Sequence, residues 1–254
     1  MDNQQLLGEL VNLAEEVGQT LLETQPRVRK LRRRIGDIVT NAELLSHSTI
    51  LKRLRILTPE IPIFSEEGKE AIRKTSRIIW IVDPIDGTFN YIHRDVFWGI
   101  SIALVANQQT QLGVVYLPAL NRLIGATREG KVITKGNLIL HVRPDRNLSE
   151  ALIWTDWDKK AKVTPSVFVK IGRAGLRPQV RQCCSASLLA VATGNITAFI
   201  HPGPGPEDIA AGCLIVEKAG GRVTDLGGNN WTPFSDSIVA SNGLLHEQIL
   251  KAIK

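Results

Sequence analysis

The chain has 254 residues, of which 43% are apolar, and its mean hydropathy is near zero. This length allows one large domain or two modest ones. No apolar run reaches the roughly 20 residues of a membrane span, and the N-terminal residues lack the basic and then apolar layout of a signal peptide. We therefore expect a globular cytoplasmic protein without membrane association.

The net charge of +6 comes from one local feature. Six basic residues lie between positions 27 and 34, and without them 25 basic residues balance 25 acidic ones. The favoured interpretation is a solvated helix end or loop, and the functional alternative is an anion or RNA contact. We therefore do not expect nucleic acid as a partner. The basic residues are Arg27, Arg29, Lys30, Arg32, Arg33 and Arg34.

The three cysteines, Cys183, Cys184 and Cys213, do not form a recognisable pattern. An odd count with two adjacent members does not make a disulfide framework, and the spacing is not that of a zinc site. Buried, reduced thiols are the expected state.

The first half of the chain reads as two helices followed by a sheet. An apolar stripe predicts a helix over residues 3–24. A capping box of Thr40 and Glu43 predicts the start of a second helix with Leu44, Leu51 and Leu54 facing inward. After a loop with a short strand at 58–64, strands are expected at 78–82, 96–105, 112–116, 123–127 and 131–134. Their close spacing predicts an antiparallel meander.

From about residue 145 strands alternate with helices. Strands are expected at 151–154, 197–200, 222–224 and 238–241, helices at 185–193, 207–219 and 245–253, and a surface excursion at 157–165. We therefore expect an N-terminal α+β half, residues 1–144, and a C-terminal α/β half, residues 145–254.

The stretch from Ile78 to Thr88 is the clearest chemical signal. A buried apolar strand runs into Asp83 and Asp86, and Pro84 donates no hydrogen bond, so the strand is expected to end there. Gly87 and Thr88 can then open a turn whose N–H groups face an anion.

Two further carboxylates suit the same site. Asp208 opens a helix after a stiff loop of three prolines and two glycines, although helix-dipole stabilisation alone would explain it. With Glu66 and the Ile85 carbonyl, these aspartates would form an oxygen-only site of the kind that Mg²⁺ prefers. Two such ions can activate water for an in-line displacement. Spacing alone does not show that the residues converge.

Four ordered blocks resemble the inositol monophosphatase family. Residues 80–93, Trp-Ile-Val-Asp-Pro-Ile-Asp-Gly-Thr-Phe-Asn-Tyr-Ile-His, are similar to its first signature, and residues 207–221 to its second. Residues 36–40 and 65–67 match two further blocks. The resemblance implies a layered αβαβα sandwich of the inositol monophosphatase and fructose-1,6-bisphosphatase type. It also implies a homodimer and Mg²⁺-dependent, lithium-sensitive hydrolysis of a small phosphorylated substrate.

The resemblance also implies roles for individual residues. Glu66, Asp83, Asp86, Asp208 and the Ile85 carbonyl would be metal ligands, with Glu67 nearby. Thr88 would orient the attacking water, and the amides of Gly87 and Thr88 would hold the phosphate. Glu43 would help to activate the water or bind a further metal. The catalytic set is thus Thr88, Glu43 and Glu67, and the substrate-binding set is Asp86, Gly87, Thr88, Cys184, Ser185 and His201.

Several positions depart from the family pattern. Glu43 stands where the family usually has Asp, and the capping box competes for its side chain. Glu207 replaces a Trp, and His201 replaces a substrate-binding acid. The family's Gly-Ser-Ala-Ala block is replaced here by Cys184-Ser185-Ala186-Ser187, in a helix shortened by two residues. The metal residues are kept and the substrate rim is altered, which predicts a substrate other than, or broader than, inositol monophosphate.

The leading hypothesis is thus a phosphoric monoester hydrolase acting on inositol monophosphate or a related sugar or polyol phosphate. Alternatives within the superfamily are 3′-phosphoadenosine 5′-phosphate, fructose bisphosphate and histidinol phosphate. An alternative of another class is a catalytically weak RNA- or protein-binding member that uses the 27–34 cluster.

Overall fold

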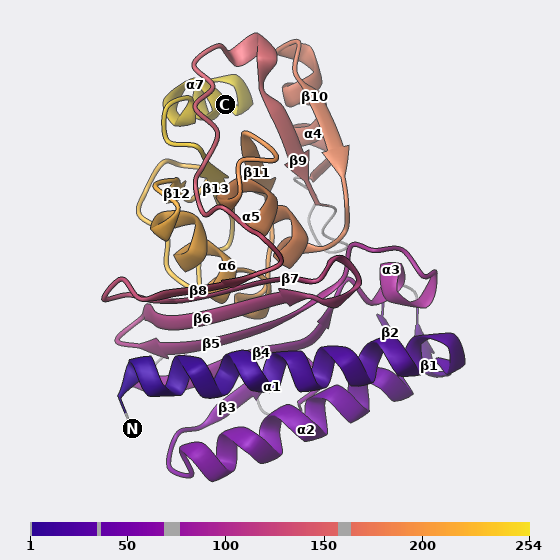
Figure 1. The fold of residues 1–254 in the computed structure, drawn as a ribbon. Helices are drawn as coiled ribbons and strands as arrows, with labels where there is room; N and C mark the ends of the chain where they lie inside the picture. Colours follow the sequence, from indigo (N-terminus) through magenta and orange to yellow (C-terminus); the bar gives the residue numbers. More distant parts are fainter. Residues whose placement is uncertain (1, 35–36, 69–76, 157–163) are drawn as a thin grey trace.

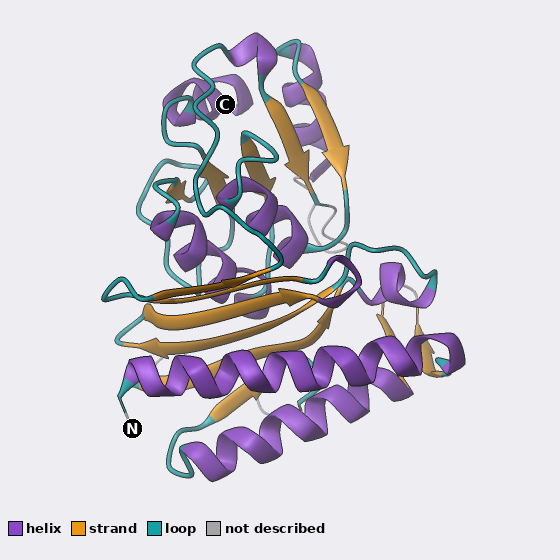
Figure 2. Cartoon of the chain, viewed as in Figure 1, coloured by secondary structure: helices purple, strands orange, loops and turns teal. Residues whose placement is uncertain are grey.

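The computed structural model describes residues 2–34, 37–68, 77–156 and 164–254 (Figures 1 and 2). Two sheets and the helices around them form five layers, so the predicted αβαβα sandwich is confirmed. The six-stranded sheet comes from residues 63–135 and the five-stranded sheet from residues 152–241. The predicted boundary at 144/145 falls between them, and the division into two domains stays a prediction.

Helices α1 (Asn3–Thr24) and α2 (Asn41–Leu57) cover one face of the six-stranded sheet (Figure 1). The strand order is β3-β4-β5-β6-β7-β8, with β3 parallel to β4 and every later pair antiparallel, which confirms the predicted meander. The strands are β3 (Ile63–Ser65), β4 (Ile78–Asp86), β5 (Gly99–Ala106), β6 (Gln109–Leu117), β7 (Arg122–Thr127) and β8 (Val132–Lys135). The five-residue helix α3 (Thr88–Ile92) follows β4 directly.

Helices α5 (Cys184–Ala192) and α6 (Pro206–Lys218) lie between the two sheets. The five-stranded sheet has the order β10-β9-β11-β13-β12. Its strands are β9 (Leu152–Thr155), β10 (Arg177–Val180), β11 (Ala198–His201), β12 (Arg222–Thr224) and β13 (Ile238–Ser241). Helices α4 (Thr164–Arg173) and α7 (His246–Ile253) cover its outer face.

Alternating side chains explain why the second sheet carries helices on both faces. In β9, Trp154 packs toward α5 and α6, whereas Ile153 packs toward α4 and α7. In β11, Phe199 and Ile200 divide in the same way. Successive strand residues point to opposite faces, so apolar neighbours in the sequence supply two cores.

Helix α6 approaches the six-stranded sheet closely. A Cβ atom on Gly113 in β6 would lie 2.8 Å from the Cα and 3.0 Å from the carbonyl oxygen of Ala211. Hydroxyl groups on the sheet also hold the start of α6, since Ser101 donates to the Glu207 carbonyl and Thr110 to the Ala210 carbonyl. The N-terminus of α6 is thus fixed against the strands that follow β4.

Strand β4 does not end at Pro84, so that expectation was wrong. Asp83 pairs with Ser101 and Asp86 with Gly99, with a register irregularity between them. Pro84 lies in this bulge, where its missing N–H costs the ladder nothing. The Pro84 carbonyl accepts a hydrogen bond from Ser46 of α2 at 2.8 Å.

Two smaller expectations were also wrong, and a third falls mostly outside the described residues. Leu44 is 45% exposed, although Leu51 and Leu54 of the same helix are buried. The basic segment is mostly a strand and not a helix end or loop. It follows the short η1 helix (Gln25–Arg27), and its strand β1 (Lys30–Arg34) pairs antiparallel with β2 (Asp37–Thr40). The expected excursion at 157–165 lies mostly outside the described residues, and α4 already begins at Thr164.

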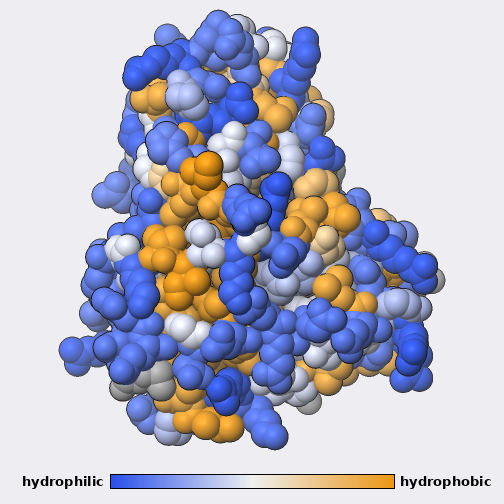
Figure 3. Space-filling view, viewed as in Figure 1, coloured by the Kyte–Doolittle hydropathy of each residue, from blue (hydrophilic) through white to orange (hydrophobic). Residues whose placement is uncertain are grey.

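The face drawn in Figure 3 is mainly hydrophilic, with separate apolar patches. Within the described residues, no helix has the combined length and apolar character needed to cross a membrane.

Candidate active site

Three carboxylates converge where β4 meets the start of α6. Asp83, Asp86 and Asp208 each offer an oxygen, and these atoms all lie within 4.8 Å of one another. Asp83 and Asp86 are buried and Asp208 is partly buried. Backbone amides fix two of the side chains, because Ile85 N–H donates to Asp83 at 2.9 Å and Gly205 N–H to Asp208 at 2.5 Å.

Glu66 joins this group from the end of β3. Its backbone N–H donates to the Val82 carbonyl at 3.2 Å, which continues the parallel pairing of β3 with β4. The residue as a whole keeps contact with solvent, but its carboxyl group lies within hydrogen-bonding reach of Asp83. Glu67 lies close enough to affect the charge of both Glu66 and Glu43.

Burial and mutual repulsion raise the pKa of every carboxyl group in this cluster. Enclosure of its carboxyl group, and then Glu207 and Glu67, raise the pKa of Glu66 to about 8. Burial and then Glu66 hold the pKa of Asp83 well above its usual range, and burial and then Glu207 do the same for Asp208. Burial also raises the pKa of Asp86, although the Ser185 N–H opposes the shift.

Crowded buried acids are costly unless a cation compensates their charge. The donors are oxygen atoms from scattered elements, which suits a hard divalent ion. The residues present therefore fit a divalent metal ion.

Glu43 serves the helix and the site at once. One carboxylate oxygen accepts from Thr40 N–H at 2.6 Å, which completes the capping box of α2, and the other accepts from the Thr88 hydroxyl. Thr88 Oγ1 also lies 3.2 Å from the Ile85 carbonyl oxygen. Burial raises the pKa of Glu43 to about 7 against the effect of the Thr88 hydrogen bond. The capping box and the contact with Thr88 are thus compatible.

The first turn of α5 anchors Asp86. Cys184 N–H donates to one carboxylate oxygen of Asp86 at 3.2 Å, and Ser185 N–H donates to the other. Gly87 has a φ of +83°, a conformation that a side chain disfavours, and it lies against Cys183 and the Phe97 carbonyl. The N-termini of α2, α5 and α6 therefore meet at one site, where their dipoles favour negative charge.

His201 ends β11 beside the same acids. One ring nitrogen of His201, Cys184 Sγ and a carboxylate oxygen of Asp208 lie within 4.8 Å of one another. Gly203 N–H donates to His201 Nδ1 at 3.1 Å. The structure thus brings His201 and Cys184 to Asp208, and Asp208 to Asp83 and Asp86. The roles assigned to these residues from the sequence stay predictions.

Sequence reasoning missed Asp156 and Cys183. Asp156 is buried directly after β9 and accepts from Gln182 N–H at 2.5 Å, and burial and then Asp86 raise its pKa to about 7. Cys183 Sγ contacts the Asp86 carbonyl oxygen at 3.6 Å. A carboxylate directly after an apolar strand was the available signal for Asp156, as it was for Asp83.

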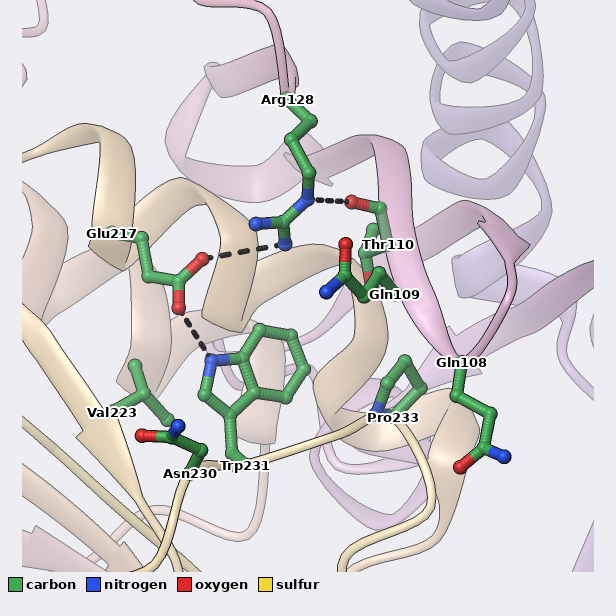
Figure 4. A pocket seen from close by; sticks show the side chains of 9 residues that line it. All are labelled: Gln108, Gln109, Thr110, Arg128, Glu217, Val223, Asn230, Trp231 and Pro233. Atoms are coloured by element: carbon green, nitrogen blue, oxygen red, sulfur yellow. Dashed lines mark hydrogen bonds and ion pairs between the residues drawn. The ribbon is translucent and has the colours of Figure 1, made fainter.

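A separate cavity of about 300 Å³ lies away from these residues (Figure 4). There, Glu217 at the end of α6 accepts from Trp231 Nε1 at 2.6 Å and faces Arg128, whose Nε donates to the Thr110 carbonyl. None of its lining residues belongs to the carboxylate cluster.

The structure is a layered αβαβα protein with an acidic cluster whose oxygen atoms suit a divalent cation. Residues 2–254 match the Inositol monophosphatase family. A fructose-1,6-bisphosphatase/inositol-1-monophosphatase of Thermotoga maritima is 32% identical over 245 residues, which cover 96% of this chain and 93% of that protein. Nus factor SuhB of Escherichia coli K12 is 32% identical over 244 residues, covering 93% and 91%.

Solved structures of this family have the same fold as this chain. An IMPase of Thermotoga maritima superposes with a TM-score of 0.86 at 30% identity, covering 98% of this chain and 96% of that chain. The extragenic suppressor protein suhB of Bartonella henselae has a TM-score of 0.88 at 26% identity and 98% coverage of both. The chain belongs to the inositol monophosphatase family, whose members include proteins with phosphatase names and others named Nus factor.

Proposed function

We propose that this protein hydrolyses a small phosphate monoester in a Mg²⁺-dependent reaction, with an inositol, sugar or polyol phosphate as substrate. The observation that carries the proposal is the convergence of Asp83, Asp86 and Asp208 beside the hydrogen-bonded pair of Thr88 and Glu43. An oxygen-only acidic site next to a polarised hydroxyl suits attack by water on phosphorus.

Asp83, Asp86, Asp208, Glu66 and the Ile85 carbonyl would hold the ions. Bound Mg²⁺ would lower the pKa of a water molecule and offset charge on the phosphate. Glu43 accepts a hydrogen bond from the Thr88 hydroxyl, which leaves a Thr88 oxygen lone pair to orient the attacking water. With a pKa of about 7, Glu43 can accept a proton near neutral pH. The Gly87 and Thr88 amides would hold the phosphate, and no covalent enzyme intermediate is needed.

The residues at the edge of the carboxylate cluster support a substrate other than, or broader than, inositol monophosphate. His201 offers a nitrogen, and Cys184 and Ser185 present the first turn of α5, at the edge of the carboxylate cluster. The T. maritima relative named for both fructose-1,6-bisphosphate and inositol-1-phosphate favours a panel that includes both.

The test is inorganic phosphate release from inositol monophosphates, fructose 1,6-bisphosphate, 3′-phosphoadenosine 5′-phosphate and histidinol phosphate, with and without Mg²⁺. Wild type should turn over at least one substrate only with Mg²⁺, Asp83→Asn should lose that turnover, and lithium should inhibit it. Asp236→Asn, which changes an exposed aspartate, is the matched control and should retain activity. A folded protein that is silent on the whole panel would refute the proposed activity.

A binding function is the second candidate because relatives at 32% identity carry the name Nus factor SuhB. Arg27, Arg29 and Lys30 are exposed and could supply salt-sensitive contacts with RNA phosphates. Reversing these three charges should abolish RNA binding, measured by filter retention at two salt concentrations. RNA binding that survives the reversal would remove the basic segment from consideration.

The homodimer also stays a proposal, which light scattering on the purified chain tests directly.

A further inference from the structure

Two donors that differ in kind from the carboxylates reach Asp208 from the C-terminal half of the chain. Cys184 begins α5 and His201 ends β11, and 17 positions in the sequence separate them. The fold nevertheless brings a sulfur, an imidazole nitrogen and a carboxylate oxygen within 4.8 Å of one another. Cys184 and His201 are buried, so neither donor is an incidental surface group.

This donor set selects a metal different from the one that the aspartates favour. Thiolate and imidazole bind Zn²⁺ and similar transition ions strongly, whereas Mg²⁺ prefers oxygen alone. Tetrahedral zinc with bonds of about 2.0–2.3 Å needs ligand atoms about 3.3–3.6 Å apart. Because the three atoms lie within 4.8 Å of one another, each pair needs to close by at most about 1.5 Å.

The surroundings allow this rearrangement. Gly203 N–H donates to His201 Nδ1 at 3.1 Å, so metal binding through Nδ1 requires loss of that hydrogen bond. The Cys184 thiol contacts Asp156 Oδ2 at 3.8 Å, a long contact that a stronger metal–sulfur bond can replace. On binding, the metal–sulfur bond forms, the S–H bond breaks and the proton leaves to solvent.

We propose that Cys184, His201 and Asp208 form a second metal site, selective for Zn²⁺ over Mg²⁺, at the rim of the acidic cluster. The site uses one ligand of the proposed Mg²⁺ set, Asp208, so Zn²⁺ and Mg²⁺ binding should be coupled. If the proposed phosphatase function holds, Zn²⁺ would act as an inhibitor, but the binding itself does not depend on turnover.

The test uses Co²⁺ as a visible substitute for Zn²⁺, titrated into the full chain with Mg²⁺ present and a phosphine reductant. Thiolate coordination gives a sulfur-to-cobalt charge-transfer band in the near ultraviolet. Wild type should develop this band to saturation at one equivalent, and Zn²⁺ should bleach it. Absence of the band would overturn the proposal.

Variants assign the ligands. Cys184→Ser should abolish the band, whereas Cys183→Ser and Cys213→Ser, which alter the other two buried cysteines, should retain it. His201→Gln should keep a thiolate band but weaken Zn²⁺ affinity at least tenfold in competition with Co²⁺. That variant decides the question should Cys184→Ser fail to fold by circular dichroism. A band that follows Cys183 or Cys213, or unchanged affinity in His201→Gln, would refute the site.

Discussion

His246 should make the stability of the fold depend on pH. It begins α7 and is fully buried, between Thr224 of β12 and Ser241 of β13. Gly243 N–H donates to Ser241 Oγ, and Thr224 Oγ1 donates to the Asp225 carbonyl. The Ser241 hydroxyl is thus free to donate to His246 Nδ1, and Nε2–H donates to Thr224. Both ring nitrogens are satisfied in the neutral form.

A second proton would disrupt this arrangement. Burial and then Arg222 lower the pKa of His246 from 6.5 to about 4, with Glu247 acting in the opposite direction. As pH falls through 6.5 the unfolded chain takes up a proton that the folded chain refuses, so stability is lost until the pH reaches about 4. Each pH unit costs about 1.4 kcal/mol, which gives a loss of about 3 kcal/mol over the window.

The assay is urea unfolding at pH 7.5 and pH 4.5, with EDTA, for wild type and His246→Gln. Glutamine can donate and accept but does not titrate, and the titration of the acidic cluster is common to both proteins. Two pH units below 6.5, wild type should have lost about 2.7 kcal/mol more than the variant. Equal losses in the two proteins would refute the assignment of a neutral buried imidazole.

Three further changes probe the site and its support. Glu43→Gln should preserve the capping box and leave the free energy of unfolding within about 1 kcal/mol, yet reduce kcat about 10²-fold or more; equal kcat would exclude Glu43 as a base. Gly113→Ala should destabilise by about 1–3 kcal/mol because it pushes α6 from the sheet, while Gly8→Ala, with nothing within 4 Å, should stabilise by about 0.5–1 kcal/mol; urea titrations that rank them otherwise would contradict the packing. Asp156→Ala should lower the free energy of unfolding by about 1–3 kcal/mol because it removes the acceptor of Gln182 N–H, and Asp156→Asn should lower it less. Equal losses for the two variants in urea titrations would contradict this role of the Asp156 carboxylate.

The sequence predicts the elements and the acidic residues well because their signals are local. The stripe of residues 3–24, the capping box at Thr40 and the apolar run before Asp83 each arise from neighbouring residues, and the corresponding elements are present. The exposure of Leu44 could not be read in this way. It depends on how α2 turns against the sheet, which sequence periodicity does not define.

Long-range relations account for the rest. The sequence left Glu43 open between a helix cap and a catalytic role, and only the tertiary structure shows one oxygen on the Thr40 N–H and the other on the Thr88 hydroxyl. Cysteine spacing gave no zinc pattern, because Cys184 meets His201 through the sheet topology and not through sequence proximity. Residue types predict which ligands and proton acceptors are available, and the topology determines which of them lie together.

The bulge in β4 allows two carboxylates three positions apart in the sequence to face the same site. Residues three positions apart in a regular strand point to opposite faces, so Asp83 and Asp86 would lie on different sides of the sheet. Their partners Ser101 and Gly99 are two apart, so the extra residue turns an odd spacing into an even one and aims both side chains the same way. Because Pro84 cannot donate to the ladder, it opposes the straight register in which Asp86 would face away. Pro84→Val should therefore weaken metal binding, although all the proposed ligands are retained. The measurement is the increase in the free energy of unfolding in urea when Mg²⁺ is added. An increase equal to that of wild type would show that Pro84 is not needed to keep the bulged register.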